Sequence, residues 1–241
     1  MRRLRRVLAA SVALALTVQT ATATCARDAM IVFDGSASMA QFSPETGAIP
    51  NIVDARLAMA QAMPLIEDVR RIGLLTYGPG PEGSCEGINL RFPPRERAAA
   101  PVIEALNLLD PNGRTPLAAA MERAADALEH RRRPGIMVMV TDGRESCDGA
   151  PCAVATRLAE EALDLTIHVI GFRATRAYQP WNHPEPADFR AETECIATAT
   201  GGLFVLTATV DELVAAMEQT LGCLVVGRLD RSGPAGVDPT G

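Results

Sequence analysis

Two segments of the chain carry carboxylates and hydroxyls at spacings that suit a metal site. Asp34, Ser36 and Ser38 directly follow a run of apolar residues and alternate with small residues. Because alternate residues of an extended segment point to the same side, these three side chains can present their oxygens together. Asp142 follows a second apolar run. An all-oxygen ligand set of mixed charge suits a hard octahedral cation, with Mg²⁺ as the expected ion and Mn²⁺ or Ca²⁺ as alternatives.

The apolar runs before these residues predict the strands of a mainly parallel sheet. They are short and continuous, and longer segments with helical periodicity separate them, which is typical of strands buried on both faces beneath helices. The runs cover residues 30–33, 72–77, 136–140, 165–170 and 203–206. Open α/β sheets bind ligands at the carboxyl ends of their strands, and both Asp34 and Asp142 follow such an end.

One further apolar run predicts a strand at the edge of this sheet. Residues 88–92 follow residues 72–77 too closely for a parallel crossover, so we expect an antiparallel edge strand. Amphipathic periodicity predicts helices over residues 52–66, 117–128 and 210–221. Thr209 and Glu212 form a capping box at the start of the last helix. The expected fold class is α/β: a Rossmann-like open sheet, mostly parallel with one antiparallel edge strand, and helices on both faces.

The three polar segments resemble the metal-ion-dependent adhesion site of the von Willebrand factor A (VWA) family. The family pattern is D-x-S-x-S after the first strand, a Thr in a later loop and an Asp after the fourth strand. The matching segments here are Asp34-Gly35-Ser36-Ala37-Ser38, Gly113-Arg114-Thr115-Pro116-Leu117 and Thr141-Asp142-Gly143. The resemblance covers residues 28–222. It implies a complete set of five metal ligands: Asp34, Ser36, Ser38, Thr115 and Asp142.

The resemblance also implies how the site would work. Ser36 and Ser38 would bind the metal directly, and the other ligands would bind it directly or through water. One coordination position would be left for an Asp or Glu of an unknown partner protein. This describes a non-enzymatic, divalent-metal-dependent adhesion or scaffold module. Segment 173–187 follows a parallel strand and should lie on the metal side, where Tyr178 and Trp181 are expected partner contacts.

Two other functions stay open at this point: a metal-dependent hydrolase-like enzyme, and a metal-independent structural domain stabilised by disulfides. All 23 basic residues are Arg, so the chain lacks the Lys that a P-loop or a haloacid-dehalogenase-type site requires. The residues around Ser36 do not fit the G-x-S-x-G pattern of serine hydrolases. The formal net charge is −6 and no basic stripe is present, which disfavours nucleic acid as a partner.

The first 23 residues have the pattern of a secretory signal peptide. Four arginines precede a short apolar stretch, residues 7–18, and Ala21-Thr22-Ala23 has the form of a cleavage site. The stretch is short for a membrane span, with an uncleaved anchor as the alternative, and no other stretch could cross a bilayer. Cleavage would remove four Arg and no acid, taking the charge from −6 to −10. We expect a periplasmic or extracellular protein whose residues 223–241 form a flexible tail.

All six cysteines follow the expected cleavage site. An even count in an exported chain predicts three disulfides. Cys147 and Cys152 flank a short, turn-prone segment and are expected to pair with each other, which would stiffen the loop after Asp142. The remaining four are expected to pair as Cys25–Cys223 and Cys85–Cys195, with their other connectivities open.

Overall fold

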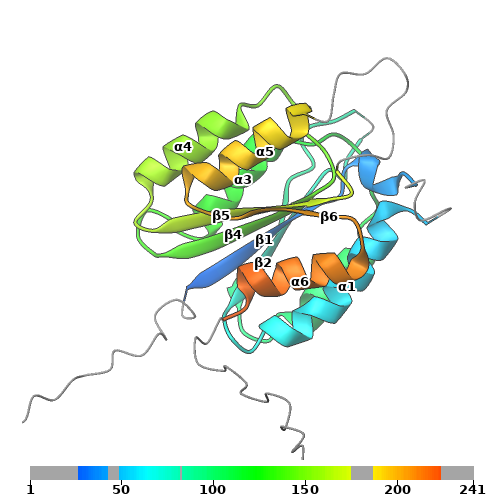
Figure 1. Ribbon diagram of the computed structural model, residues 1–241, viewed down its shortest axis with the longest axis horizontal. Helices are drawn as coiled ribbons and strands as arrows, with labels where there is room; N and C mark the ends of the chain where they lie inside the picture. Colours follow the sequence, from blue (N-terminus) through cyan, green and yellow to red (C-terminus); the bar gives the residue numbers. More distant parts are fainter. Residues whose placement is uncertain (1–26, 43–48, 82, 175–186, 224–241) are drawn as a thin grey trace, which may run out of the picture.

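Six strands form one sheet in the order β3-β2-β1-β4-β5-β6 (Figure 1). The strands are β1 (Asp28–Asp34), β2 (Ile72–Tyr77), β3 (Asn89–Arg95), β4 (Gly135–Thr141), β5 (Leu165–Phe172) and β6 (Phe204–Thr207). This computed structural model describes residues 27–42, 49–81, 83–174 and 187–223. All neighbouring strands are parallel except β3, which pairs antiparallel with β2 at one edge. The predicted α/β fold class is therefore confirmed.

The register of the sheet brings the ends of β1, β2 and β4 to the same edge. Asp34 pairs with Tyr77 of β2, and Phe33 pairs with Val140 of β4. Because β1 and β4 are adjacent and parallel, Asp34 and Asp142 emerge beside each other at the carboxyl edge.

Side chains of the central strands alternate between two hydrophobic cores. Ile31 and Phe33 of β1 contribute to one core, and Met30 and Val32 contribute to the other; all four are fully buried. The first core is covered by α1 (Asn51–Ile66), α2 (Ala99–Asn107) and α6 (Val210–Leu221). The second is covered by α3 (Leu117–Ala127), α4 (Pro151–Glu161) and α5 (Ala187–Ala199). Burial on both faces explains why the strands are continuous apolar runs in the sequence.

The start of α6 has the predicted capping box. The Thr209 hydroxyl accepts a hydrogen bond from the backbone N–H of Glu212, and the Glu212 carboxylate accepts one from the N–H of Thr209, each at 3.2 Å. A single short 3₁₀ helix, η1 (Ala37–Ala40), follows β1 among the described residues. No helix in the described ranges is long and apolar enough to cross a membrane.

The two edge strands differ in how they end the sheet. β3 contains Pro93 and Pro94, and its pairing with β2 shifts register twice. Proline lacks a backbone N–H, so it occurs in sheets at edges and bulges. At the other edge, β6 is four residues long.

His168 lies in β5 and is buried, with 9% of its surface exposed. Its Nδ1 atom accepts a hydrogen bond of 2.9 Å from the backbone N–H of Leu203, at the entry to β6. Burial, followed by the positive charges of Arg27 and Arg70, lowers the pKa of His168 to about 4. The neutral imidazole is thus the form that holds this connection.

The low pKa of His168 predicts that the free energy of unfolding decreases as the pH is lowered. The folded-state pKa of about 4 lies below the ordinary value of 6.5, so the unfolded chain binds this proton more readily. The stabilisation is complete above pH 6.5 and is lost as the pH falls toward 4, by on the order of 3 kcal/mol. His168→Asn keeps an acceptor near the position of Nδ1 but does not titrate. Urea unfolding at several pH values should therefore show that the free energy of unfolding falls less steeply with acid in this variant than in the wild type. The same pH dependence in both proteins would contradict the assignment.

Candidate metal centre

Asp34 is the most deeply buried polar group of the site. It ends β1 with no exposed surface. Its Oδ1 atom accepts a hydrogen bond of 2.8 Å from the backbone N–H of Ser36. Its Oδ2 atom accepts one of 2.7 Å from the hydroxyl of Thr141, at the end of β4. The carboxylate is therefore held by the two strand ends between which it lies.

Ser36, Ser38 and Asp142 form a continuous chain of oxygens beside Asp34. The hydroxyls of Ser36 and Ser38 are 2.9 Å apart, and the Ser38 hydroxyl donates to Asp142 Oδ1 at 2.5 Å. Ser36 is buried, whereas Ser38 and Asp142 are partly exposed. The set is thus buried on one side and open toward solvent on the other.

Thr115 approaches the same set from the loop before α3. A Cβ atom built on Gly143 would lie 3.5 Å from the Ser38 hydroxyl and 3.6 Å from the Thr115 hydroxyl, so both hydroxyls border Gly143. The backbone of Thr115 is fixed by Ser146: its N–H donates to the Ser146 hydroxyl at 2.8 Å, and its carbonyl accepts from the Ser146 N–H at 3.0 Å. The structure therefore brings all five predicted ligand residues to one place at the carboxyl edge.

Backbone contacts hold the Asp34–Ser38 loop against two neighbouring loops. The N–H of Gly35 donates to the carbonyl of Tyr77 at 2.8 Å, and the N–H of Ala37 donates to that of Gly113 at 3.1 Å. Gly78 and Gly113 have φ angles of 104° and 71°, and a Cβ on Gly113 would lie 2.1 Å from the carbonyl oxygen of Gly78. Both positions require glycine, because no side chain fits this close approach.

The two carboxylates influence each other electrostatically. Burial raises the pKa of Asp34, and hydrogen bonds from Ser36 and Thr141 oppose that rise. Burial and the negative charge of Asp34 raise the pKa of Asp142 to about 7. The neutral donors around the pair thus offset only part of the cost of ionising both groups.

This donor set fits a hard divalent cation. Two carboxylates and three hydroxyls converge from three loops, and all five groups are oxygen ligands of the type that Mg²⁺, Mn²⁺ and Ca²⁺ accept. A cation beside Asp34 and Asp142 would also offset the repulsion between their charges. In the described residues no cluster of three or more His, Cys, Asp or Glu is present, so the hydroxyls are needed to complete the set.

Asn51 is a further residue of the site that sequence reasoning missed. It begins α1, is 6% exposed, and donates from Nδ2 to Asp142 Oδ2 at 3.1 Å. Asp142 is thus held at both oxygens, by Ser38 and by Asn51. The sequence contains no local signal for this contact, because the two residues are 91 positions apart.

Comparison with known proteins finds similarity to one family over part of the chain. Residues 29–145 match the model of the von Willebrand factor type A domain. Among solved structures, a von Willebrand factor type A protein from Catenulispora acidiphila superposes with a TM-score of 0.57 at 17% identity, over 82% of this chain and 42% of that one. These matches support a VWA domain.

Three other proteins are similar to this chain in sequence or in fold. The uncharacterized protein YwmD of Bacillus subtilis is 25% identical over 231 residues, covering 90% of this chain and 97% of YwmD. An aerotolerance-related membrane protein from Bacteroides fragilis has a TM-score of 0.60 at 15% identity, over 81% of this chain and 98% of that one. Proximal thread matrix protein 1 from the mussel byssus, described with a zinc-occupied MIDAS (metal-ion-dependent adhesion site) motif, has a TM-score of 0.56 at 19% identity. The match covers 82% of this chain and 46% of that one.

The disulfides correct the predicted pairing. Cys85 is bonded to Cys147 and Cys152 to Cys195, with Cα–Cα distances of 5.8 and 5.6 Å. The predicted Cys147–Cys152 and Cys85–Cys195 pairs are wrong, because α4 begins at Pro151 and its first turn directs Cys152 toward the neighbouring α5. Cys25 lies outside the described residues, so the Cys25–Cys223 pair stays a prediction. Disulfides are typical of oxidising compartments, which indicates an extracytoplasmic protein.

The Cys85–Cys147 bond fastens two loops that border the metal ligands. Cys147 follows Ser146, which fixes the backbone of Thr115, and Cys85 follows Ser84, whose carbonyl accepts a 3.1 Å hydrogen bond from the N–H of Arg114. Loops 84–85, 113–115 and 142–147 are therefore joined at one point. The bond closes a loop far longer than the one that a Cys147–Cys152 pair would close.

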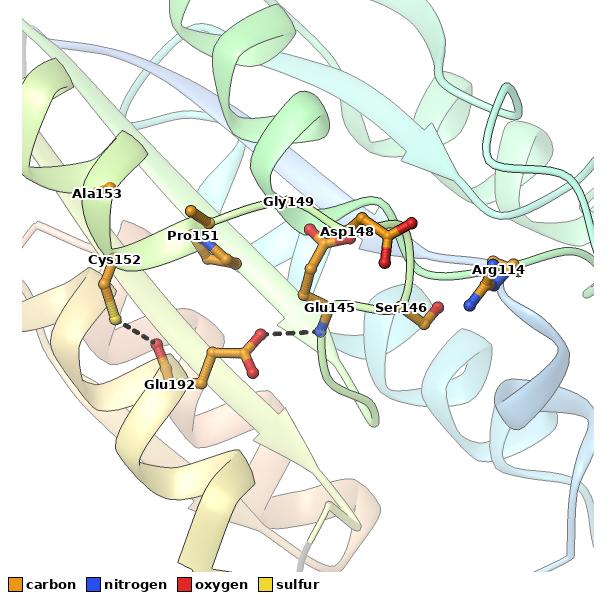
Figure 2. A pocket seen from close by; sticks show the side chains of 10 residues that line it. Arg114, Glu145, Ser146, Asp148, Gly149, Pro151, Cys152, Ala153 and Glu192 are labelled. Atoms are coloured by element: carbon orange, nitrogen blue, oxygen red, sulfur yellow. Dashed lines mark hydrogen bonds between the residues drawn. The ribbon is translucent and has the colours of Figure 1, made fainter.

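A cavity of about 490 Å³ lies beside the site, between the loop after β4, the first turn of α4 and Glu192 of α5 (Figure 2). Two of its acidic residues hold the loop in place. Glu145 accepts hydrogen bonds from the N–H groups of Cys147 and Ala118, and so caps the first turn of α3. Glu192 of α5 accepts from the N–H of Glu145 at 2.9 Å. These carboxylates position the Asp142 loop.

The residues predicted to contact a partner, Tyr178 and Trp181, lie outside the described residues. Arg173 precedes this segment in the sequence, directly after β5, and its guanidinium lies 4.7 Å from the centroid of the Phe172 ring.

The Cys85–Cys147 bond is expected to support both stability and metal binding. The double variant Cys85→Ser/Cys147→Ser opens a loop of 62 residues, for which chain entropy predicts a loss of about 4 kcal/mol. It should also weaken Mg²⁺ binding measured by calorimetry, because the Thr115 and Asp142 loops lose their common anchor. The matched control is Cys152→Ser/Cys195→Ser, which opens a loop of 43 residues away from Thr115. Equal effects of the two double variants on Mg²⁺ affinity would show that only global stability is involved.

Proposed function

We propose that this chain is an extracytoplasmic, divalent-metal-dependent protein-interaction module of the adhesion or scaffold type. One observation carries the proposal: five oxygen-bearing side chains from three loops converge at the carboxyl edge of the sheet. These are Asp34, Ser36, Ser38, Thr115 and Asp142. Asp34 and Ser36 are buried, whereas Ser38 and Asp142 are partly exposed, so a group from another protein could reach a bound metal.

The resemblance to the VWA family implies a role for each of the five residues. The hydroxyls of Ser36 and Ser38 lie 2.9 Å apart and would bind Mg²⁺ directly, and the Thr115 hydroxyl borders Gly143 together with that of Ser38. Asp34 and Asp142 would supply negative charge. Mg²⁺ retains several of its waters in protein sites, so an Asp or Glu of the partner could replace one of them. Mn²⁺ and Ca²⁺ accept the same ligands, and the zinc-occupied motif of the mussel protein supports a divalent ion at such a site.

The metal is proposed to serve as a docking point. VWA domains are mostly interaction modules without enzymatic activity. The two histidines of the described residues are engaged elsewhere: His130 lies 3.0 Å from the carbonyl of Ala125, and His168 accepts from Leu203. Neither contacts the five ligands, so neither histidine of the described residues is placed to act as a base for hydrolysis at the site.

The domain limits and location are part of the same proposal. Residues 1–23 would form a signal peptide, residues 28–222 the VWA domain and residues 223–241 a tail. The disulfides favour an oxidising compartment, and the mature protein would act in the periplasm or outside the cell.

Metal binding should appear as a ligand-induced gain in thermal stability that depends on Asp142. At a Mg²⁺ concentration of 100 times Kd, binding stabilises a protein by about 2.7 kcal/mol, which is roughly 5–10 °C in Tm for a domain of this size. Asp142→Asn should abolish this gain. In EDTA the same variant should be at least as stable as the wild type, because it removes a charge that the charge of Asp34 repels. Asp164→Asn, at an exposed ion pair with Arg27, is the matched control. A wild-type Tm that is equal in Mg²⁺ and EDTA would overturn the proposal and favour a metal-independent structural domain.

The docking role can be tested by partner capture. Immobilised wild-type protein should retain a specific envelope protein in Mg²⁺ and release it in EDTA, while Asp34→Ala and Ser36→Ala should retain none. Thr198→Ala removes a hydroxyl from an exposed position on α5 and should capture normally. Unchanged capture by Asp34→Ala and Ser36→Ala in Mg²⁺ would exclude a partner carboxylate on the metal. A parallel assay with phosphomonoesters and carboxylic esters tests the hydrolase alternative.

A further inference from the structure

Behind the proposed metal ligands lies a buried chain of polar groups that starts at Arg173. Arg173 directly follows β5, and its side chain is 3% exposed. Its Nη2 atom forms an ion pair of 2.6 Å with Asp54 of α1, and its Nε atom donates to the carbonyl of Ala208 at 3.0 Å. Its Nη1 atom donates to Asn51 Oδ1 at 3.5 Å. One guanidinium therefore connects the ends of β5 and β6 with the first turn of α1.

The contacts of Asn51 allow a single orientation of its amide. The oxygen faces a guanidinium, which can only donate, and the nitrogen faces the Asp142 carboxylate, which when ionised can only accept. A flipped amide would place its NH₂ against Arg173 and its oxygen against Asp142. Arg173 thus determines that Asn51 donates to Asp142 Oδ2.

Arg173 has features that a purely stabilising role does not explain. Its φ angle is 54°, in the left-handed region, which costs a non-glycine residue of order 1 kcal/mol. A buried ion pair also yields little net stability, because desolvation offsets the attraction. The backbone N–H of Arg173 donates to the carbonyl of Thr207 at 2.7 Å, which helps to hold this conformation. The left-handed backbone and the desolvated ion pair both cost free energy, and together with these contacts they hold the guanidinium in a fixed position.

We propose that Arg173 and Asn51 are positioning residues that orient the Asp142 carboxylate for the divalent metal. The inference rests on the proposed metal-binding function and deepens it. Ser38 holds one oxygen of Asp142 and Asn51 holds the other, so the two contacts fix the plane of the carboxylate. Arg173 acts through Asn51 and fixes which way its amide points. Partners of this kind, which hold a ligand without touching the metal, typically contribute 10–100-fold to metal affinity.

A double-mutant cycle on Mg²⁺ affinity tests the relay in the full-length protein. Calorimetry should show that Asn51→Ala and Arg173→Met each weaken Mg²⁺ binding by about tenfold or more. The double variant should be no weaker than Asn51→Ala alone, because Arg173 acts through Asn51. Arg70→Met is the matched control: Arg70 is also buried and holds the carbonyls of Leu221 and Gly222. It should lower Tm in EDTA and leave the Mg²⁺ affinity unchanged.

Arg173→Lys keeps the proposal testable if Arg173→Met fails to fold. Lysine retains the charge opposite Asp54 but cannot contact Asp54, Asn51 and Ala208 together. It should therefore fold and still lose Mg²⁺ affinity. Wild-type affinity in Arg173→Lys, or additive losses in the double variant, would overturn the relay while leaving the proposed metal site intact. Absence of Mg²⁺ binding by the wild type would overturn both.

Discussion

The proximity of two carboxylates constrains the whole carboxyl edge of the sheet. β1 and β4 are adjacent parallel strands, and neighbouring strands lie about 4.8 Å apart. Asp34 ends one strand and Asp142 follows the other, so their charges cannot move far from each other. The groups that surround them are neutral donors: hydroxyls, backbone N–H groups and the amide of Asn51. Burial raises the pKa of each carboxyl above its ordinary value, and the charge of Asp34 raises the pKa of Asp142 further; the donors oppose these rises only in part.

The loops at this edge are held by hydrogen bonds and disulfides to neighbouring segments. The Asp34–Ser38 loop depends on the carbonyls of Tyr77 and Gly113, and Thr115 depends on Ser146. The loop after β4 is anchored near one end by the Cys85–Cys147 bond, and α4, which follows it, is fastened to α5 by the Cys152–Cys195 bond. The geometry of the oxygen set is therefore a property of the whole domain.

The sequence was sufficient to predict the strands, and to predict that Asp34 and Asp142 lie at neighbouring strand ends, for a physical reason. Strands that are buried on both faces are continuous apolar runs in the sequence. The end of such a run also identifies the residues that lie at the end of the strand. Helices α2, α4 and α5 were not predicted; α4, for example, buries Pro151, Ala155 and Leu158, which is a weak apolar pattern. The disulfide pairing was mispredicted for the same reason, because it depends on where α4 begins.

Contacts between distant residues were beyond the reach of local patterns. Asn51 is 91 positions from Asp142 and 122 from Arg173, and none of the three has a neighbour in the sequence that marks the contact. The left-handed backbone of Arg173 likewise has no sequence signal, since glycine is the residue that usually marks such a position.

The two ends of the sheet also bear on how this protein associates with others. An exposed strand edge can pair with a strand from a second molecule and so form aggregates. Here the β3 edge is interrupted by Pro93 and Pro94, and β6 offers four residues. Neither edge is a good template for an added strand. Both ends of the sheet therefore disfavour edge-to-edge polymerisation of the folded domain.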